Sequence, residues 1–228
     1  MAEDALFHNG HRERLREKFL QGKLTAAELL EFLLGFAIPR RDLRPLSRRL
    51  LAEFGGIHQV LSASQDQLMK IDGVGKTTAL LLMATHEIMT HAYKSVLKEE
   101  SVYCNPDRMD NYCRMIVGGK TIEEFHVLFL DAEYRLLEDW THSVGTVNWS
   151  AVYPREIIKK ALDLNARSVV LVHNHPTPNM SFSDDDVAIT ETLMDLLKVM
   201  GLALHDHFLV SGDIVYSIKG MQLLNKRK

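Results

Sequence analysis

One sixteen-residue stretch, LVHNHPTPNMSFSDDD at residues 171–186, concentrates the side chains best suited to bind a metal ion. Residues two apart in a β-strand point to the same side, so His173 and His175 would present two imidazoles from one strand face. Asp186, in the first turn of the helix expected next, would add a carboxylate oxygen if the intervening loop folds back. Two histidines, one aspartate and a water complete a four-coordinate zinc site with one position open for catalysis.

The aspartates of this stretch also have a purely structural explanation. Ser183 followed three residues later by Asp186 matches a capping box, and Asp184 and Asp185 suit the positive end of a helix dipole. Capping leaves the two histidines on one strand face unexplained. A second His-x-His, at residues 205–207, is followed by no suitably spaced carboxylate, and we expect it to be structural or to support a ligand from behind.

The elements that position these residues follow from the hydrophobic pattern. From residue 12 to about residue 93, apolar residues recur at helical spacing, with breaks at Pro39 and at Gly55-Gly56, which predicts short packed helices. Beyond residue 100 the pattern predicts alternating strands and helices. We expect strands within 124–145 (two, joined by a turn at 131–134), 166–175, 202–212 and 214–220, and helices within 153–165 and 184–200.

This order of elements predicts an α+β or mixed α/β protein with two parts. Residues 1–97 should form an all-helical domain, and residues 98–228 an α/β sandwich. The charged segment at 94–120, with Pro106 and a closing glycine pair, would contain the boundary. In the helix at 184–200 the inward face should carry Ile189, Leu193, Leu196, Leu197 and Met200.

Composition limits the class of protein. The chain has 228 residues, 46% of them hydrophobic, which is enough for a buried core. No apolar run approaches the roughly 20 residues needed to span a bilayer, and the charged N-terminus lacks a secretory apolar region, so we expect a cytoplasmic protein without a membrane partner. Cys104 and Cys113 lack a metal-binding spacing and should be ordinary reduced thiols.

The first part of the chain also has features that suit nucleic acid. Residues 1–97 contain 13 Lys and Arg against 11 Asp and Glu, and basic side chains cluster at 11–18 and 39–49. Such clusters follow a phosphate backbone or form a solvated helix face. Gly73, Val74 and Gly75 lie between two apolar helical segments and resemble the turn of a helix-hairpin-helix motif, with Lys76 beside it to contact a phosphate. Hairpins of this kind also serve only for protein packing.

The spacing of the predicted ligands also carries a resemblance. His173, His175, Ser183 and Asp186 match the pattern HxHx7SxxD of the JAMM, or MPN+, metalloprotease family. The segments EEFHVLFLD, VYPREIIKKAL, VLVHNHP and HDHFLVSG, within residues 120–217, resemble the C-terminal domain of the bacterial RadC family, described as DNA repair proteins. The first part is similar to the N-terminal region of the same family. At residues 177–180 this chain has TPNM, where RadC proteins usually have SGDP.

The resemblance implies an MPN/JAMM, cytidine-deaminase-like, α/β sandwich with one zinc ion per chain bound by His173, His175 and Asp186. It implies that Ser183 stabilises a developing oxyanion or orients the site. In this family a glutamate at the start of an upstream strand acts as the base, and Glu123 matches the E-x-F pattern. From the residues alone, Glu124 and Glu156 are alternatives, and each is equally explained as a strand-edge or helix-start charge.

Three functions are consistent with this sequence. The first is a zinc-dependent hydrolase, by analogy a peptidase or isopeptidase with a peptide or protein substrate, recruited to DNA through Gly73, Gly75 and Lys76. The second is a non-catalytic DNA-binding adaptor in repair or recombination, and the third is a metal-dependent enzyme that processes DNA. The ligand set together with the serine and the upstream glutamate favours catalysis, whereas the substrate class follows from analogy alone.

Overall fold

The chain folds as two compact units, residues 1–87 and 88–228. The computed structural model describes residues 2–145, 152–176, 181–212 and 214–220, with side chains from residue 10 onward. Residues 177–180, where this chain differs from the usual RadC sequence, therefore lie outside the described residues. Helix α6 (Lys76–Glu99) belongs to both units. The domain boundary expected at residue 97 remains a prediction.

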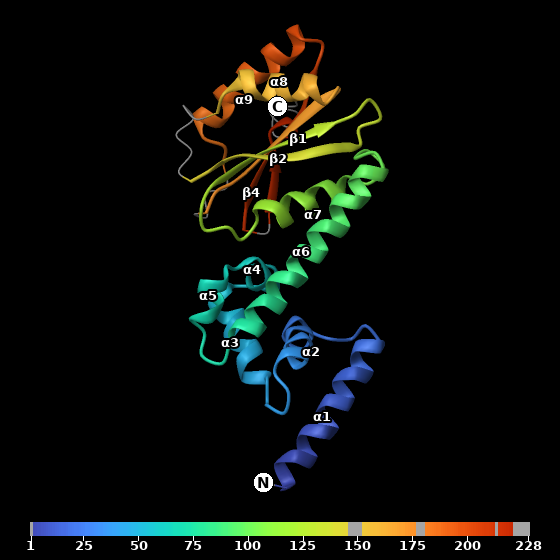
Figure 1. Cartoon of the computed structure of the whole chain (residues 1–228), viewed down its shortest axis with the longest axis vertical. Helices are drawn as coiled ribbons and strands as arrows, with labels where there is room; N and C mark the ends of the chain where they lie inside the picture. The colour runs from blue at the N-terminus through green and yellow to red at the C-terminus, as the bar shows by residue number, and fades with distance from the viewer. Residues whose placement is uncertain (1, 146–151, 177–180, 213, 221–228) are drawn as a thin grey trace, which may run out of the picture. The chain divides into compact units, whose positions relative to one another are not determined.

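The first unit is helical, as the spacing of its apolar residues predicts (Figure 1). Thr25 and Ser64 begin two of its helices with capping boxes, and Gly55 ends a third with a φ of 90°. Leucines that are fully buried, such as Leu30 and Leu50, form its core. The helices that precede α6 are α1 (Ala2–Leu20), α2 (Ala26–Ala37), α3 (Arg44–Phe54), α4 (Ile57–Ser62) and α5 (Gln65–Met69).

The second unit is built on a five-stranded mixed sheet with the strand order β2-β1-β3-β4-β5. Strands β3 and β4 are parallel, and every other neighbouring pair is antiparallel. The strands are β1 (Glu124–Leu130), β2 (Leu136–Val144), β3 (Ser168–Asn174), β4 (Ala203–Ser211) and β5 (Ile214–Ser217), and they confirm the predicted strand segments. The helical first unit and the mixed sheet of the second unit together form the mixed α+β fold expected from the sequence.

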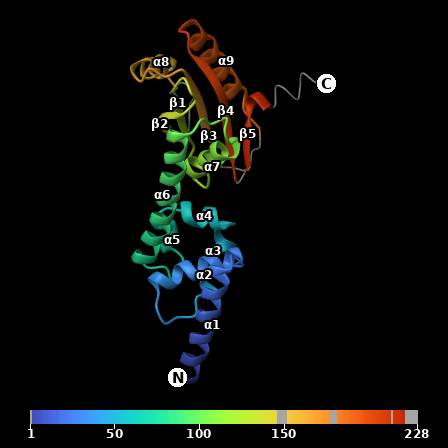
Figure 2. The same ribbon diagram turned by 90° about the vertical axis from the view of Figure 1, so that its right-hand side faces the viewer.

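Helices cover both faces of this sheet. Helix α7 (Pro106–Val117) lies on one face, and α8 (Pro154–Asp163) and α9 (Asp184–Val199) lie on the other (Figure 2). The central strands are buried on both sides, so their residues alternate between two cores. In β3, Val170 and Val172 face the α7 core, whereas Val169 and Leu171 face the core beneath α8 and α9. His173 continues the second series, which places it on the α9 side.

The sequence analysis missed one helix and predicted too wide a buried face for another. The segment at 94–120, where the boundary is expected, contains α7, whose Tyr112, Cys113 and Val117 are fully buried against the sheet. In α9, Leu193 and Leu197 are buried as expected, but Leu196 and Met200 are 41% and 46% exposed. The stripe of α9 that meets the sheet is therefore narrower than the stripe of apolar residues in the sequence.

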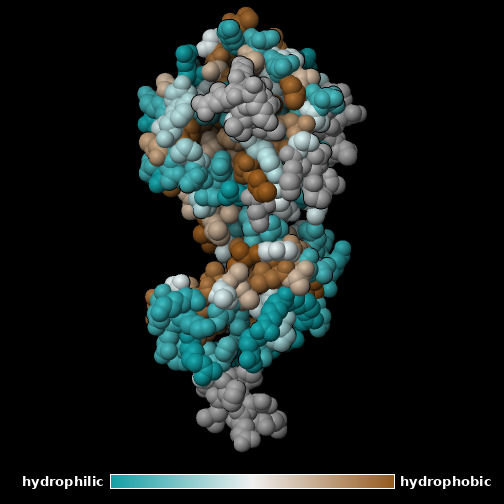
Figure 3. Space-filling view, turned by 180° about the vertical axis from the view of Figure 1, so that it is seen from behind, coloured by the Kyte–Doolittle hydropathy of each residue, from teal (hydrophilic) through white to brown (hydrophobic). Residues whose placement is uncertain are grey.

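The surface carries both polar and apolar side chains. On the face seen in Figure 3, hydrophilic side chains cover much of each unit, and hydrophobic ones gather in a band on the helical unit. Among the helices that the structure describes, none combines the length and apolar character required to cross a membrane.

Candidate metal centre

Strand β3 and the residue that follows it position the two histidines side by side. His173 is the sixth residue of this strand and is fully buried. The backbone N–H of His175 donates to the carbonyl of Val210 on β4 at 3.0 Å, so the extended conformation continues past Asn174. Because the strand geometry is kept, the two imidazoles point to the same side, and their Nε2 atoms are 3.3 Å apart.

Helix α9 positions Asp186, which lies in its first turn. Ser183 is its N-cap, and the capping box expected from the sequence is present: the Ser183 hydroxyl accepts from the Asp186 N–H at 3.1 Å. In return, Oδ2 of Asp186 accepts from the N–H and the hydroxyl of Ser183, both at 2.6 Å. The structural explanation and the metal-ligand hypothesis are therefore compatible, because the cap holds Asp186 in one orientation with Oδ1 left for another partner.

The three predicted ligands converge. Nε2 of His173 lies 3.0 Å from Oδ1 of Asp186, and Nε2 of His175 lies 3.7 Å from Oδ2. Two ligand atoms placed tetrahedrally at about 2.0–2.1 Å from zinc are roughly 3.3 Å apart. The separations found here lie around that value, so the donor set fits a tetrahedral zinc ion.

The state of Asp186 supports the same conclusion. Its side chain is fully buried, and among the described residues Oδ1 has no assigned hydrogen-bond donor, although Nε2 of His173 lies 3.0 Å away. Burial alone would raise the pKa of this carboxyl, but His173, His175 and Ser183 lower it, and the net pKa lies well below its ordinary value. A buried carboxylate oxygen without an assigned donor is well placed to bind a cation.

A second layer of side chains supports His173 from behind. Its Nδ1 lies 2.8 Å from Nε2 of the fully buried His207, whose Nδ1 lies 2.6 Å from the hydroxyl of Thr190. Burial lowers the pKa of His207 well below its ordinary value, so this ring is neutral. The supporting role expected for the second His-x-His therefore belongs to His207. Thr190 was not predicted, although its position four residues after Asp186 places it on the same helix face.

Two groups of side chains within the described residues bring potential ligand atoms within 4.8 Å of one another. One group is Glu123, His173 and His175, and the other is His173, Asp186 and His207. Both ring nitrogens of His207 already have neighbours at hydrogen-bond distance, so His207 is the weaker ligand candidate. The remaining side chains, Glu123, His175 and Asp186, each lie close to His173, and their roles as ligand or base stay predictions.

The sheet register separates Glu123 from Glu124. In the antiparallel pair β1·β3, Phe125 is opposite His173, and the two residues therefore lie on the same face of the sheet. Glu123, two residues before Phe125, reaches the histidines, whereas the side chain of Glu124 lies on the other face. There its carboxylate contacts Lys120 at 3.3 Å. Glu156 is exposed in the first turn of α8.

Asn174 ties the metal-binding strand to the segment that carries Glu123. Its Oδ1 accepts from the N–H of Glu124 at 2.8 Å, and its Nδ2 donates to the carbonyl of Ile122 at 3.1 Å. Both backbone neighbours of Glu123 are thus held by one side chain that is 3% exposed. No sequence pattern indicates this role, because the two segments meet only in the folded sheet.

A buried ionic network lies on the opposite face of the sheet. His126 contacts Asp139 at 2.9 Å and Glu124 at 3.3 Å, and Asp139 accepts from the Tyr112 hydroxyl at 2.6 Å. Burial by itself would lower the pKa of His126, but Asp139 and Glu124 raise it above its ordinary value. This network joins β1 and β2 to α7 and is separate from the centre around His173.

The predicted DNA contacts belong to the first unit, whereas the residues of the metal centre belong to the second. Gly73 has a φ of 93°, which favours glycine, and the Val74 N–H donates to the carbonyl of Ile71 at 3.0 Å, closing the turn. Gly75 precedes α6, and Lys76 is the first residue of that helix and is exposed. The turn therefore has the local geometry of a helical hairpin.

Comparison with known proteins agrees with this description. The family model for a RadC-like JAB domain matches residues 103–223, and that for the UPF0758 N-terminal region matches residues 8–80. A UPF0758 protein of Fusobacterium nucleatum subsp. nucleatum is 37% identical over 220 residues, which cover 92% of this chain and 95% of that protein. The chain therefore resembles this relative through both of its units.

Proposed function

Because this chain belongs to the RadC family, we propose that its second unit is a zinc-dependent hydrolase of the metallopeptidase type, with one zinc ion per chain. The observation that carries the proposal is the convergence of His173, His175 and Asp186 within 3.0–3.7 Å of one another, with Oδ1 of Asp186 buried and without a donor among the described side chains. The proposed substrate is a peptide or isopeptide bond.

The roles of the side chains follow from their places. Zinc would supply Lewis acidity, which polarises a carbonyl group and makes water a stronger acid. Glu123 is on the same face as the histidines and accepts the proton of the attacking water, then passes it to the leaving amine. Asn174 keeps the backbone of Glu123 in place through its two contacts with residues 122 and 124.

Ser183 acts on the centre through Asp186. Its hydroxyl proton is directed to Oδ2 of Asp186 at 2.6 Å, and its oxygen accepts from the Asp186 N–H. Of the two roles implied by the family, orientation of the ligand is therefore favoured over direct stabilisation of an oxyanion.

The test is an activity screen of the full-length, zinc-loaded protein against peptide, isopeptide-linked and DNA substrates. Glu123→Gln should keep one zinc per chain and lower turnover by about 10²–10⁴-fold, the usual contribution of a general base. Glu124→Gln is the matched control, because its side chain lies on the other face of the sheet. Unchanged turnover in Glu123→Gln would remove this residue from the role of base.

The metal content decides between catalysis and an adaptor function. One tightly held zinc that is lost in His173→Ala supports the hydrolase. A protein that binds no zinc when purified in its presence favours the non-catalytic adaptor, and hydrolysis of DNA alone favours a DNA-processing enzyme.

We further propose that the first unit binds the DNA backbone through Gly73, Gly75 and Lys76. The closed glycine turn and the exposed lysine at the start of α6 support this contact. Binding to a DNA duplex should weaken steeply with salt and in Lys76→Ala, but not in Lys98→Ala, a lysine near the other end of α6. Binding that is independent of salt, or equal in both variants, would contradict the proposal.

A further inference from the structure

A cavity of about 150 Å³ in the first unit lies between α1, α2 and the loop that precedes α3. Its lining combines basic side chains, among them Arg12, Arg16 and Arg41, with the aromatic rings of Phe32 and Phe36. None of these residues takes part in the functions proposed above. The combination of guanidinium groups with exposed aromatic rings is the one that proteins use to hold a nucleotide.

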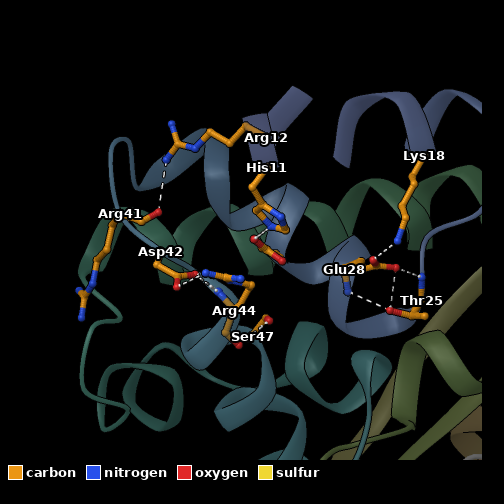
Figure 4. A network of polar contacts seen from close by, with 10 residues as sticks. His11, Arg12, Lys18, Thr25, Glu28, Arg41, Asp42, Arg44 and Ser47 are labelled. Carbon is orange, nitrogen blue, oxygen red and sulfur yellow. Dashed lines mark hydrogen bonds and ion pairs between the residues drawn. The ribbon is translucent and has the colours of Figure 1, made fainter. Parts of the chain in front are cut away.

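The carboxylates of this cavity are already paired. Glu31 lies 2.8 Å from Nε2 of His11. Asp42 lies 2.7 Å from the guanidinium of Arg44 (Figure 4). Neither Arg12 nor Arg41 has a carboxylate within 4 Å among the side chains that the structure describes. The lining contains three arginines against two carboxylates, and this excess of positive charge favours an anionic ligand.

The aromatic wall can accept a flat ring. Phe36 is 73% exposed and meets Phe32 edge to face at a centroid distance of 5.3 Å. Phe32 is held from its other side by Phe19, stacked at 4.5 Å. Gly35, between the two rings on α2, has no side chain, and a Cβ atom there would meet nothing within 4 Å. An exposed phenylalanine beside open space provides a stacking surface for a nucleobase.

Arg41 connects this cavity to the glycine turn. Its backbone carbonyl accepts from Nη2 of Arg12 at 3.4 Å, while its side chain turns away from Arg12 (Figure 4). There its guanidinium lies against Gly73, where a Cβ atom would be 3.2 Å from Nη1. One exposed arginine thus borders both the cavity and the turn proposed to contact a phosphate.

We propose that this cavity binds an unpaired nucleotide of a DNA strand whose neighbouring phosphate contacts the glycine turn. The inference rests on the DNA contact proposed for Gly73, Gly75 and Lys76. The base stacks on Phe36, and Arg12 and Arg41 contact the phosphates on either side. The first unit therefore recognises DNA with a single-stranded end or gap, in preference to a continuous duplex.

The experiment measures binding of the full-length protein to a blunt duplex and to the same duplex with a single-stranded overhang, by fluorescence anisotropy. The wild type should bind the overhang DNA at least about fivefold more tightly, since stacking on one aromatic ring contributes roughly 1–3 kcal/mol. Phe36→Ala and Arg12→Ala should abolish this preference. Arg14→Ala, an exposed arginine of the same helix outside the cavity lining, should retain it.

Equal binding of both DNAs by the wild type, or an unchanged preference in Phe36→Ala, would overturn the inference while leaving the duplex contact intact. If the wild type binds neither DNA, the DNA contact and the inference both fail, and the hydrolase proposal is unaffected. If the protein binds free thymidine monophosphate tightly but shows no preference for overhang DNA, the ligand of the cavity is a free nucleotide and not part of a DNA strand. This result would overturn the inference. Circular dichroism verifies the fold, because Phe36 is exposed and its removal leaves the core unchanged.

Discussion

His207 accepts a hydrogen bond from His173: Nδ1 of His173 donates to Nε2 of His207 at 2.8 Å. The direction follows from Thr190, whose hydroxyl donates to the carbonyl of Asp186 and can therefore only accept from Nδ1 of His207. With its proton on Nδ1, the neutral His207 ring presents a lone pair at Nε2. His173 then carries its own proton on Nδ1, and its Nε2 lone pair points toward His175 and Asp186, where it can bind a metal.

Removal of His207 should weaken zinc binding. His207→Ala leaves Nδ1 of His173 without its acceptor, and loss of such an outer partner typically costs about 10–100-fold in metal affinity. Competition with a chromogenic chelator measures the change. His205→Ala is the control, because His205 contacts the Tyr103 hydroxyl instead of the centre. Equal zinc affinity in both variants would exclude a contribution of the His173–His207 hydrogen bond to metal binding.

The three aspartates at the start of α9 should differ in their effect on zinc. Asp186→Asn removes a buried anionic ligand and should abolish stoichiometric zinc binding, measured by metal analysis after dialysis. Asp184→Asn changes an exposed acid in the same helical turn and should keep the metal. Retention of zinc by Asp186→Asn would show that this residue is only a helix cap.

The buried His126 should make stability depend on pH. Its pKa is raised above 6.5 in the folded protein, so its contribution is complete below that pH and is lost as the pH rises through the folded-state value. Burial by itself would raise the pKa of Asp139, but His126 lowers it, so the contribution of Asp139 is lost only as the pH falls toward the acid range. Stability from the pair is therefore greatest between the two ordinary pKa values.

Urea unfolding of the zinc-free protein at several pH values tests this expectation. His126→Gln should destabilise the fold by about 3–5 kcal/mol at acidic to neutral pH, because Asp139 and Glu124 are left buried without their partner. The difference between wild type and variant should shrink in alkaline solution. A difference that stays constant with pH would show that His126 is not protonated in the folded state.

Two neighbouring leucine positions of α9 should respond very differently to truncation. Leu193→Ala removes a fully buried side chain and should cost about 2–5 kcal/mol in the free energy of unfolding. Leu196→Ala removes a side chain that is 41% exposed and should change stability by only about 0.5–1 kcal/mol. Denaturant unfolding of the two variants compares them directly, and equal losses would contradict the packing of α9 described here.

The sequence by itself determined the features that depend on local backbone geometry. Strand periodicity put His173 and His175 on one side, the spacing from Ser183 to Asp186 gave the helix cap, and the glycines at 73 and 75 marked a turn. These patterns depend only on the fixed residue repeat of strands and helices, so they can be predicted from one sequence. The same repeat predicted too wide a buried face for α9. It identifies the apolar residues of a helix, but it does not show how many of them the rest of the fold covers.

Only the tertiary structure decided the features that depend on strand pairing. The register of β1 against β3 placed Glu123 on the side of the histidines and turned Glu124 toward His126. Pairing of β3 with β4 brought His207 behind His173, residues that are 34 positions apart. Helix α7 became recognisable as core only once a sheet existed to cover its apolar face. The physical reason is that a register shift of one residue exchanges the two faces of a strand, and long-range packing selects the register.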